Sequence, residues 1–91
     1  MASNFQLFNI RNRDNLHLSM HGDFDGTSAF ELITALLEKD EDYFTVFIDT
    51  NEINEVYSFG IEVLKKNLNL PAMKKRNLIF IGKHRQKFWE I

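Results

Sequence analysis

Residues 44–64 read FTVFIDTNEINEVYSFGIEVL, and this stretch decides the fold. Its first five residues, 44–48, form a near-continuous apolar run, which is typical of a central strand covered on both faces. The run ends at Asp49, a polar loop is predicted to follow, and a helix is predicted from Ser58 to about Asn69. Because this helix begins with a serine, a small hydroxyl group lies at the positive end of the helix dipole. The stretch therefore predicts a functional loop carried by a rigid sheet.

Two strands and a helix precede this stretch. Residues 5–10 are rich in apolar side chains, and residues 16–21 alternate strictly between apolar and polar ones, as a half-exposed strand does. The five-residue connection between them favours an antiparallel hairpin. Residues 25–39 then have helical spacing. The apolar stripe of this helix is Ala29, Leu32, Ile33 and Leu36.

A strand and a short helix complete the chain. Residues 78–81 form a second apolar run, predicted to be the central neighbour of strand 44–48. Residues 83–91 predict one or two helical turns in which Phe88 packs back on the core. The order is β-β-α-β-α-β-α, and strands that alternate with helices require parallel pairing and right-handed crossovers. The sequence thus predicts a small single-domain α/β fold over residues 1–91, with a mixed four-stranded sheet layered with helices.

The composition limits the class of protein. The 91 residues suffice for one domain, and a hydrophobic content of 44% with nine phenylalanines suits a compact core. The chain has no cysteine, which excludes disulfides and thiolate metal sites. Its first residues show no signal peptide, and no apolar stretch approaches the ~20 residues that span a bilayer. We therefore expect a cytoplasmic protein without membrane insertion.

Charge is distributed unevenly along the chain, although the net charge is only −2. Residues 14–62 hold twelve acids against one base, Lys39, whereas residues 65–91 hold eight bases against one acid, Glu90. This pattern predicts an electrostatically polarised surface that steers partners, unless the charges are simply solvated faces. A pI of about 5.9 argues against a dedicated nucleic-acid binder, so we expect no nucleic-acid partner.

Two segments resemble the STAS domain, the family of sulfate transporters and anti-sigma factor antagonists. In that family a strand ends in an acidic residue and a loop then reads Asp-Ser-Ser-Gly-Leu, whose first serine is the regulatory phosphorylation site of the antagonists. The matching residues here are Tyr57, Ser58, Phe59, Gly60 and Ile61. Upstream, GDFDGTSAFEL at residues 22–32 is similar to the family's opening of the first helix. The resemblance covers roughly residues 5–85 and implies the STAS architecture.

By function, the resemblance implies a non-enzymatic regulatory module that binds a protein, such as an anti-sigma factor kinase or a related regulator. No cofactor is implied. The alternative is a constitutive STAS subunit of a transport or regulatory complex. Docking is expected through the loop and the start of the second helix: Asn54, Glu55, Tyr57, Ser58, Phe59, Gly60 and Ile61.

Three of these positions carry specific expectations. Ser58 is the candidate phosphorylation site, although serine is also a favoured helix N-cap. Tyr57 replaces the family's aspartate and Phe59 replaces its second serine, so both aromatics are candidate docking anchors around Ser58. Gly60 is retained, and its lack of a side chain would let the backbone of a partner come close.

An enzyme interpretation rests on Asp23 and Asp25. The motif DFDGT looks like the first motif of the haloacid-dehalogenase phosphatases, where the first aspartate is a nucleophile and the second a general acid. The last buried strand is not followed by the acidic pair that this reaction needs, and a turn capped by Asp25 or Thr27 explains the motif more simply. His17 and His21 suggest a metal site, but four residues along a strand separate them by roughly 13 Å. We expect neither catalytic residues nor metal ligands.

Overall fold

The computed structural model describes residues 4–11, 15–38, 45–70, 73 and 77–89 of the 91-residue chain. The predicted element order, β-β-α-β-α-β-α, is confirmed. The strands and helices are β1 (Gln6–Arg11), β2 (Asn15–Phe24), α1 (Gly26–Glu38), β3 (Thr45–Val56), α2 (Ser58–Leu68), β4 (Asn77–Ile81) and α4 (Arg85–Trp89). The turn expected between the first two strands lies mostly outside the described residues.

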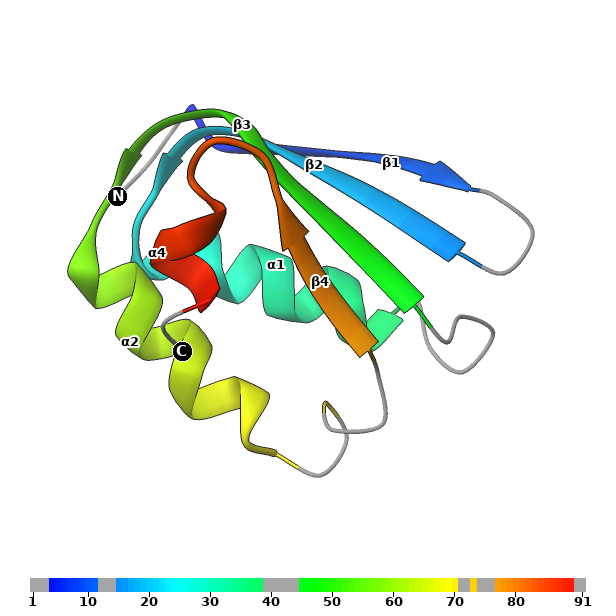
Figure 1. Ribbon diagram of the computed structural model, residues 1–91. Coiled ribbons are helices and arrows are strands. Elements are labelled where there is room, and N and C mark those ends of the chain that lie inside the picture. Colours follow the sequence, from blue (N-terminus) through cyan, green and yellow to red (C-terminus); the bar gives the residue numbers. More distant parts are fainter. Residues whose placement is uncertain (1–3, 12–14, 39–44, 71–72, 74–76, 90–91) are drawn as a thin grey trace.

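The four strands form one mixed sheet in the order β1-β2-β3-β4. Strand β1 pairs antiparallel with β2, as predicted for a hairpin, whereas β3 runs parallel to both β2 and β4. Helices α1, α2 and α4 all lie on one side of this sheet (Figure 1). In the described part of the chain, the sheet therefore has one face covered by helices and one face without a helical cover.

This one-sided layering corrects the prediction that strand 44–48 is covered on both faces. Along β3, Val46, Ile48 and Thr50 are buried, while the side chains between them, Phe47 and Asp49, are only half-buried. The prediction was wrong because an apolar residue such as Phe47 faces the open side of the sheet. Strand β4 is the expected neighbour of β3, but it lies at the edge of the sheet and not in its centre.

The polar loop predicted after Asp49 is also corrected, because β3 continues to Val56. Its second half still pairs with β2, through Glu52 opposite His21 and Val56 opposite Phe24. The register of this pairing shifts twice, as it does at β-bulges, which insert extra residues into a strand without ending it. Strand β3 therefore delivers its last residues directly to the start of α2.

The core lies between the sheet and the helices. The predicted stripe of α1 is confirmed, since all four of its residues are buried. Helix α4 closes the core with Phe88, whose ring stacks on Phe80 at a centroid distance of 4.9 Å and meets Phe24 edge-on at 5.0 Å. Such aromatic pairs add about 0.5–1.5 kcal/mol to the stabilisation from burial alone. The short last helix thus packs against both β4 and the end of β2 through Phe88.

Candidate functional site

The start of α2 is the part of the chain for which the sequence predicts docking. Tyr57 takes the N-cap position in extended conformation, and its side chain makes no capping hydrogen bond. Its backbone N–H donates to the carbonyl oxygen of Phe24 at 2.9 Å, which ties the end of β3 to the end of β2. Ser58 is therefore the first residue of the helix and not its cap, so the structural explanation of Ser58 as an N-cap is wrong.

Gly60 is needed for packing within the chain. A Cβ atom at this position would lie 2.8 Å from the carbonyl oxygen of Asp25 and 2.9 Å from that of Phe24. The first turn of α2 thus packs directly on the backbone that links β2 to α1, and Gly60 is buried. The close backbone approach expected of a partner at Gly60 is in fact made by the chain's own turn, which corrects that expectation.

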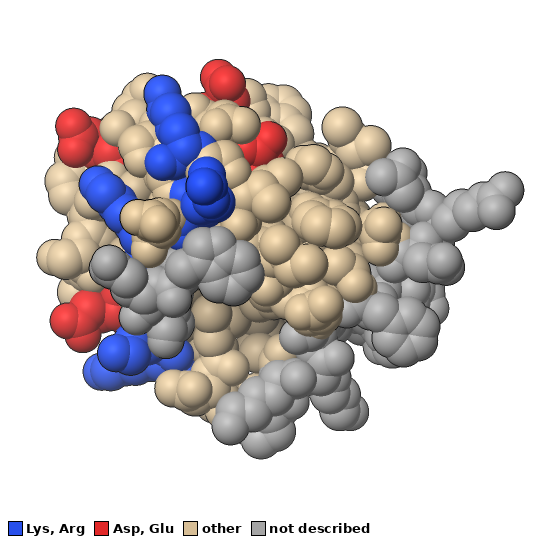
Figure 2. Space-filling model, in the orientation of Figure 1, with Lys and Arg blue, Asp and Glu red and all other residues tan. Residues whose placement is uncertain are grey.

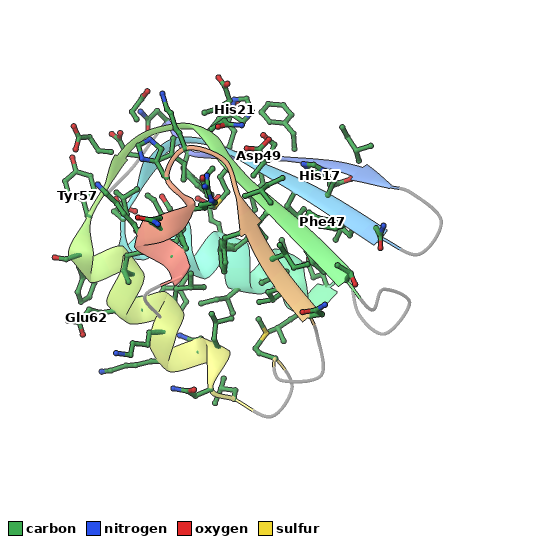
Figure 3. The ribbon with its side chains drawn as sticks, in the orientation of Figure 1. His17, His21, Phe47, Asp49, Tyr57 and Glu62 are labelled. Atoms are coloured by element: carbon green, nitrogen blue, oxygen red, sulfur yellow. The ribbon has the colours of Figure 1, made fainter. Side chains whose placement is uncertain are left out.

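The aromatic residues on either side of Ser58 point away from the core. Phe59 is 69% exposed and Tyr57 is 49% exposed, and Ser58 between them is exposed as well. Figure 3 shows Tyr57 at the outer edge of the molecule, where β3 passes into α2. Of the other predicted docking residues, Asn54 and Glu55 are exposed at the end of β3, whereas Ile61 is half-buried against the core. The structure thus leaves both aromatics and the serine open to solvent together.

Phe59 lies against the beginning of α1. A Cβ atom on Gly26 would come within 2.7 Å of the Phe59 ring, so the glycine makes room for that ring. The ring borders a hollow of about 370 Å³ that Asp25, Thr27 and Phe30 also line. Phe30, 56% exposed, is a surface residue of the site that the sequence reasoning missed. The available signal was a phenylalanine in α1 outside its buried stripe.

The end of β3 is held in place by the turn between β4 and α4. The ring Nε2 of His84 donates to the carbonyl oxygen of Ile53 at 3.0 Å. The buried hydroxyl of Thr50 donates to the carbonyl oxygen of Ile81 at 2.7 Å and accepts from the backbone N–H of His84 at 3.1 Å. These bonds join the strand that precedes the docking residues to the C-terminal segment. Sequence reasoning missed them because hydrogen bonds between residues more than thirty positions apart leave no local pattern.

The described basic residues between positions 65 and 87 share one side of the molecule. Figure 2 shows Lys and Arg side chains gathered over α4 and α2, with a few acidic groups around them. The exposed basic residues of these two segments are Lys65, Lys66, Lys83, Arg85 and Lys87. These residues form a basic surface beside the start of α2, while the polarity of the whole surface stays a prediction.

The aspartates of the phosphatase interpretation have structural roles. Asp25 caps α1, since its Oδ1 accepts from the backbone N–H of Ser28 at 2.9 Å, while the Ser28 hydroxyl donates to the carbonyl oxygen of Asp23 at 2.6 Å. Asp23 belongs to β2, where its backbone N–H donates to the Oδ1 of Asn4 at 3.2 Å. A capping carboxylate satisfies the first N–H groups of its helix. The prediction of Asp25 as a cap is confirmed.

The two histidines of β2 lie on the open face of the sheet. His17 Nε2 is 3.9 Å from the Oδ2 of Asp49, and His21 Nε2 is 3.1 Å from the hydroxyl of Ser19 (Figure 3). Each histidine thus has its own neighbour. Among the described residues, no three His, Cys, Asp or Glu side chains come together as a metal site would require.

Comparison with known proteins identifies the fold. No family model and no curated protein matches the sequence. Among solved structures, Mglu matches with a TM-score of 0.72 at 15% identity, over 86% of this chain but 20% of the Mglu chain. The chain thus spans about a fifth of that larger protein.

Two anti-sigma factor antagonists match over most of both chains. One is an antagonist STAS domain from Rhodobacter sphaeroides, with a TM-score of 0.67 at 13% identity over 88% of each chain. The other is the antagonist SpoIIAA in its unphosphorylated form, with a TM-score of 0.60 at 13% identity, over 94% of this chain and 81% of that one. The chain therefore has the SpoIIAA-like fold of STAS domains, which confirms the predicted fold class and the resemblance at the level of fold. In the described part of the chain, no helix has the length and apolar character that crossing a membrane requires.

Proposed function

We propose that this chain is a regulatory protein-binding module of the anti-sigma factor antagonist type, which docks a partner through the start of α2. The observation that carries the proposal is the exposure of Tyr57 and Phe59 on either side of the exposed Ser58. Aromatic side chains that a rigid scaffold holds in solvent are typical anchors of protein interfaces. The resemblance suggests an anti-sigma factor kinase or a related regulator as the partner. The proposal involves no catalysis and places the chain in the cytoplasm, where such a regulator acts.

A phosphate on Ser58, if the cell adds one, would release the partner. A phosphate would add close to two negative charges at the first residue of α2, where the helix dipole favours them. The fold would therefore tolerate the phosphate, while a partner packed around Tyr57 and Phe59 would have to desolvate it. Because two bulky aromatics flank Ser58, we favour docking by the aromatics over a phosphate switch. A constitutive subunit, which is never phosphorylated, is the second candidate, and the same flanking aromatics favour it.

The experiment measures the affinity of a partner, isolated with the wild-type chain from the native cell, for four variants. Tyr57→Ala and Phe59→Ala are each expected to weaken binding by about tenfold or more, and Ser58→Ala by much less. Phe8→Ala is the matched control, because Phe8 is also 49% exposed but lies on the open face of the sheet. Equal losses for Tyr57→Ala and Phe8→Ala would contradict docking at α2.

Ser58→Asp tests whether a negative charge at residue 58 releases the partner, and the phosphorylation state of the native chain separates the two forms of the proposal. A regulatory switch predicts strong weakening by the aspartate, since a buried unpaired charge in an interface costs about 2–5 kcal/mol. Constitutive docking predicts a chain without phosphate in the cell. The intact mass of the native protein decides between them, because a stoichiometric phosphate on Ser58 contradicts the constitutive form.

A further inference from the structure

A shallow groove runs along the exposed side of α1. Two adjoining hollows form it, one of about 370 Å³ beside Phe59 and one of about 350 Å³ beside Leu7 of β1. Both are lined by Thr27 and Phe30, so they are continuous. Each volume lies at the lower end of the roughly 300–1,000 Å³ of ligand sites, which is room for a bulky side chain in each.

The residues of α1 that line the groove follow helical spacing. Besides Gly26, which has no side chain, they are Thr27, Phe30, Glu31, Thr34, Ala35 and Glu38. Because α-helical residues rise 1.5 Å each, this side of α1 measures roughly 16 Å from end to end. The groove therefore matches about three turns of a second helix laid along α1.

The groove has apolar walls and acidic charge at its border. Phe30, Phe59 and Leu7 supply the apolar surface, and Glu31 and Glu38 are exposed acids that line it. Among the described residues that line the groove, none is a lysine or an arginine. This is the opposite of the basic side formed by α2 and α4. Charge complementarity selects a partner segment whose apolar side is flanked by basic residues.

We propose that this groove binds an amphipathic helix of a partner protein, with two apolar anchors one or two turns apart and lysine or arginine beside them. The two hollows would take the two anchors, in the manner in which amphipathic helices lay an apolar side into a groove. The inference rests on the proposed function, because Phe59 borders both the groove and the docking site around Ser58. It adds α1 to the docking surface and defines the chemistry of the partner.

The test uses a synthetic helix of about 18 residues, with leucines on one side and flanking lysines, and a twin in which glutamates replace the lysines. Amide chemical shifts of the labelled protein report where each peptide binds. The lysine peptide is expected to shift the amides of Thr27, Phe30, Ala35 and Phe59, and the glutamate twin to bind about tenfold more weakly. Shifts confined to the open face of the sheet, or equal binding of both peptides, would overturn the proposal.

Phe30→Ala is the decisive variant, with Phe8→Ala as its control. The two phenylalanines are 56% and 49% exposed, but Phe30 lines the groove and Phe8 lies on the opposite side of the sheet. Phe30→Ala is expected to lower the affinity for the lysine peptide by about tenfold, and Phe8→Ala is expected to leave this affinity unchanged. Since both side chains are exposed, thermal unfolding should confirm that both variants stay folded. Equal affinities of the two variants for the lysine peptide would overturn the groove proposal.

Tyr57 distinguishes the groove proposal from the proposed docking at α2, because Tyr57 does not line either hollow. Tyr57→Ala should weaken binding of the native partner but leave the affinity for the lysine peptide unchanged. If Tyr57→Ala abolishes binding of the native partner while Phe30→Ala still binds the lysine peptide with wild-type affinity, the groove proposal is wrong and the proposed function is supported. If, without peptide, the amide chemical shifts of the groove residues instead change as the protein concentration rises, a second copy of the chain occupies the groove. That result would overturn the proposal.

Discussion

Two glycines of the site show how a single missing side chain can serve either packing or recognition. At Gly60 the neighbours of an added Cβ are backbone carbonyl oxygens of Phe24 and Asp25, which cannot move without shifting the turn. At Gly26 the neighbour is the ring of Phe59, an exposed side chain that can rotate away. The same substitution at these two positions is therefore expected to change different properties of the protein.

Gly60→Ala should destabilise the fold. Alanine gains up to about 1 kcal/mol over glycine within a helix, but overpacking against fixed backbone costs about 1–3 kcal/mol. We expect a net loss in the free energy of unfolding, measured by urea denaturation. Ser58→Ala, at an exposed position of the same turn, is the control and should stay within about 0.5 kcal/mol of wild type. A Gly60→Ala variant more stable than wild type would contradict the close packing of α2 on the turn.

Gly26→Ala should preserve stability and weaken docking. The new methyl group would displace the Phe59 ring from the start of α1, while alanine suits the helix. We expect the thermal unfolding midpoint to change little and the partner affinity to fall toward that of Phe59→Ala. Unchanged affinity would mean that the position of the Phe59 ring on α1 does not matter for binding.

At the scale of elements, α1 could be predicted from the sequence, whereas the second half of β3 could not. The period of α1 is a local property, so its buried stripe could be read from the sequence alone. The polar second half of β3 reads as a loop, because Glu52, Asn54 and Glu55 are poor strand formers. That half is a strand because it pairs with β2 across shifted registers and is held by His84, interactions that are not local. The residues predicted to dock a partner lie together at the end of β3 and the start of α2, and their docking role stays a prediction. Phe30 lies beside them only through the packing of α2 on α1.

Thr50→Val tests the link between β3 and the turn before α4. Valine has a similar size but cannot accept from the His84 N–H or donate to the Ile81 carbonyl oxygen, so two partly buried polar groups lose their partner. An unsatisfied buried group costs about 1–3 kcal/mol, and we expect a loss of this order in the free energy of unfolding. Amide exchange at His84 should accelerate as well. Thr45→Val, on the half-exposed side of the same strand, is the control and should change neither.

At the scale of the molecule, one-sided layering leaves the second face of the sheet without a cover from any described helix or strand. Parallel strands are usually covered on both faces, so this arrangement is uncommon. Phe8 on β1 and Phe47 on β3 are apolar residues of the open face, and His17, Ser19 and Asp49 lie on the same face (Figure 3). These polar side chains interrupt the apolar surface, which limits the size of any exposed apolar patch. The core on the helix side must therefore supply most of the stability.

Amide exchange across the sheet tests this distribution of stability. Strands β2 and β3 are paired on both edges and bury Leu18 and Ile48 at less than 2% exposure. Within the described residues, β1 and β4 are each paired on one edge only. Local opening is rarest where backbone hydrogen bonds are buried and contacts are dense. The amides of Leu18 and Ile48 are therefore expected to exchange most slowly, with free energies of opening close to the global free energy of unfolding. Those of Phe8 should exchange faster, because the backbone at an edge opens without breaking the core. If the β1 and β4 amides were protected as strongly as those of β2 and β3, the edges would be covered in solution, and the sheet order alone would not describe the working protein.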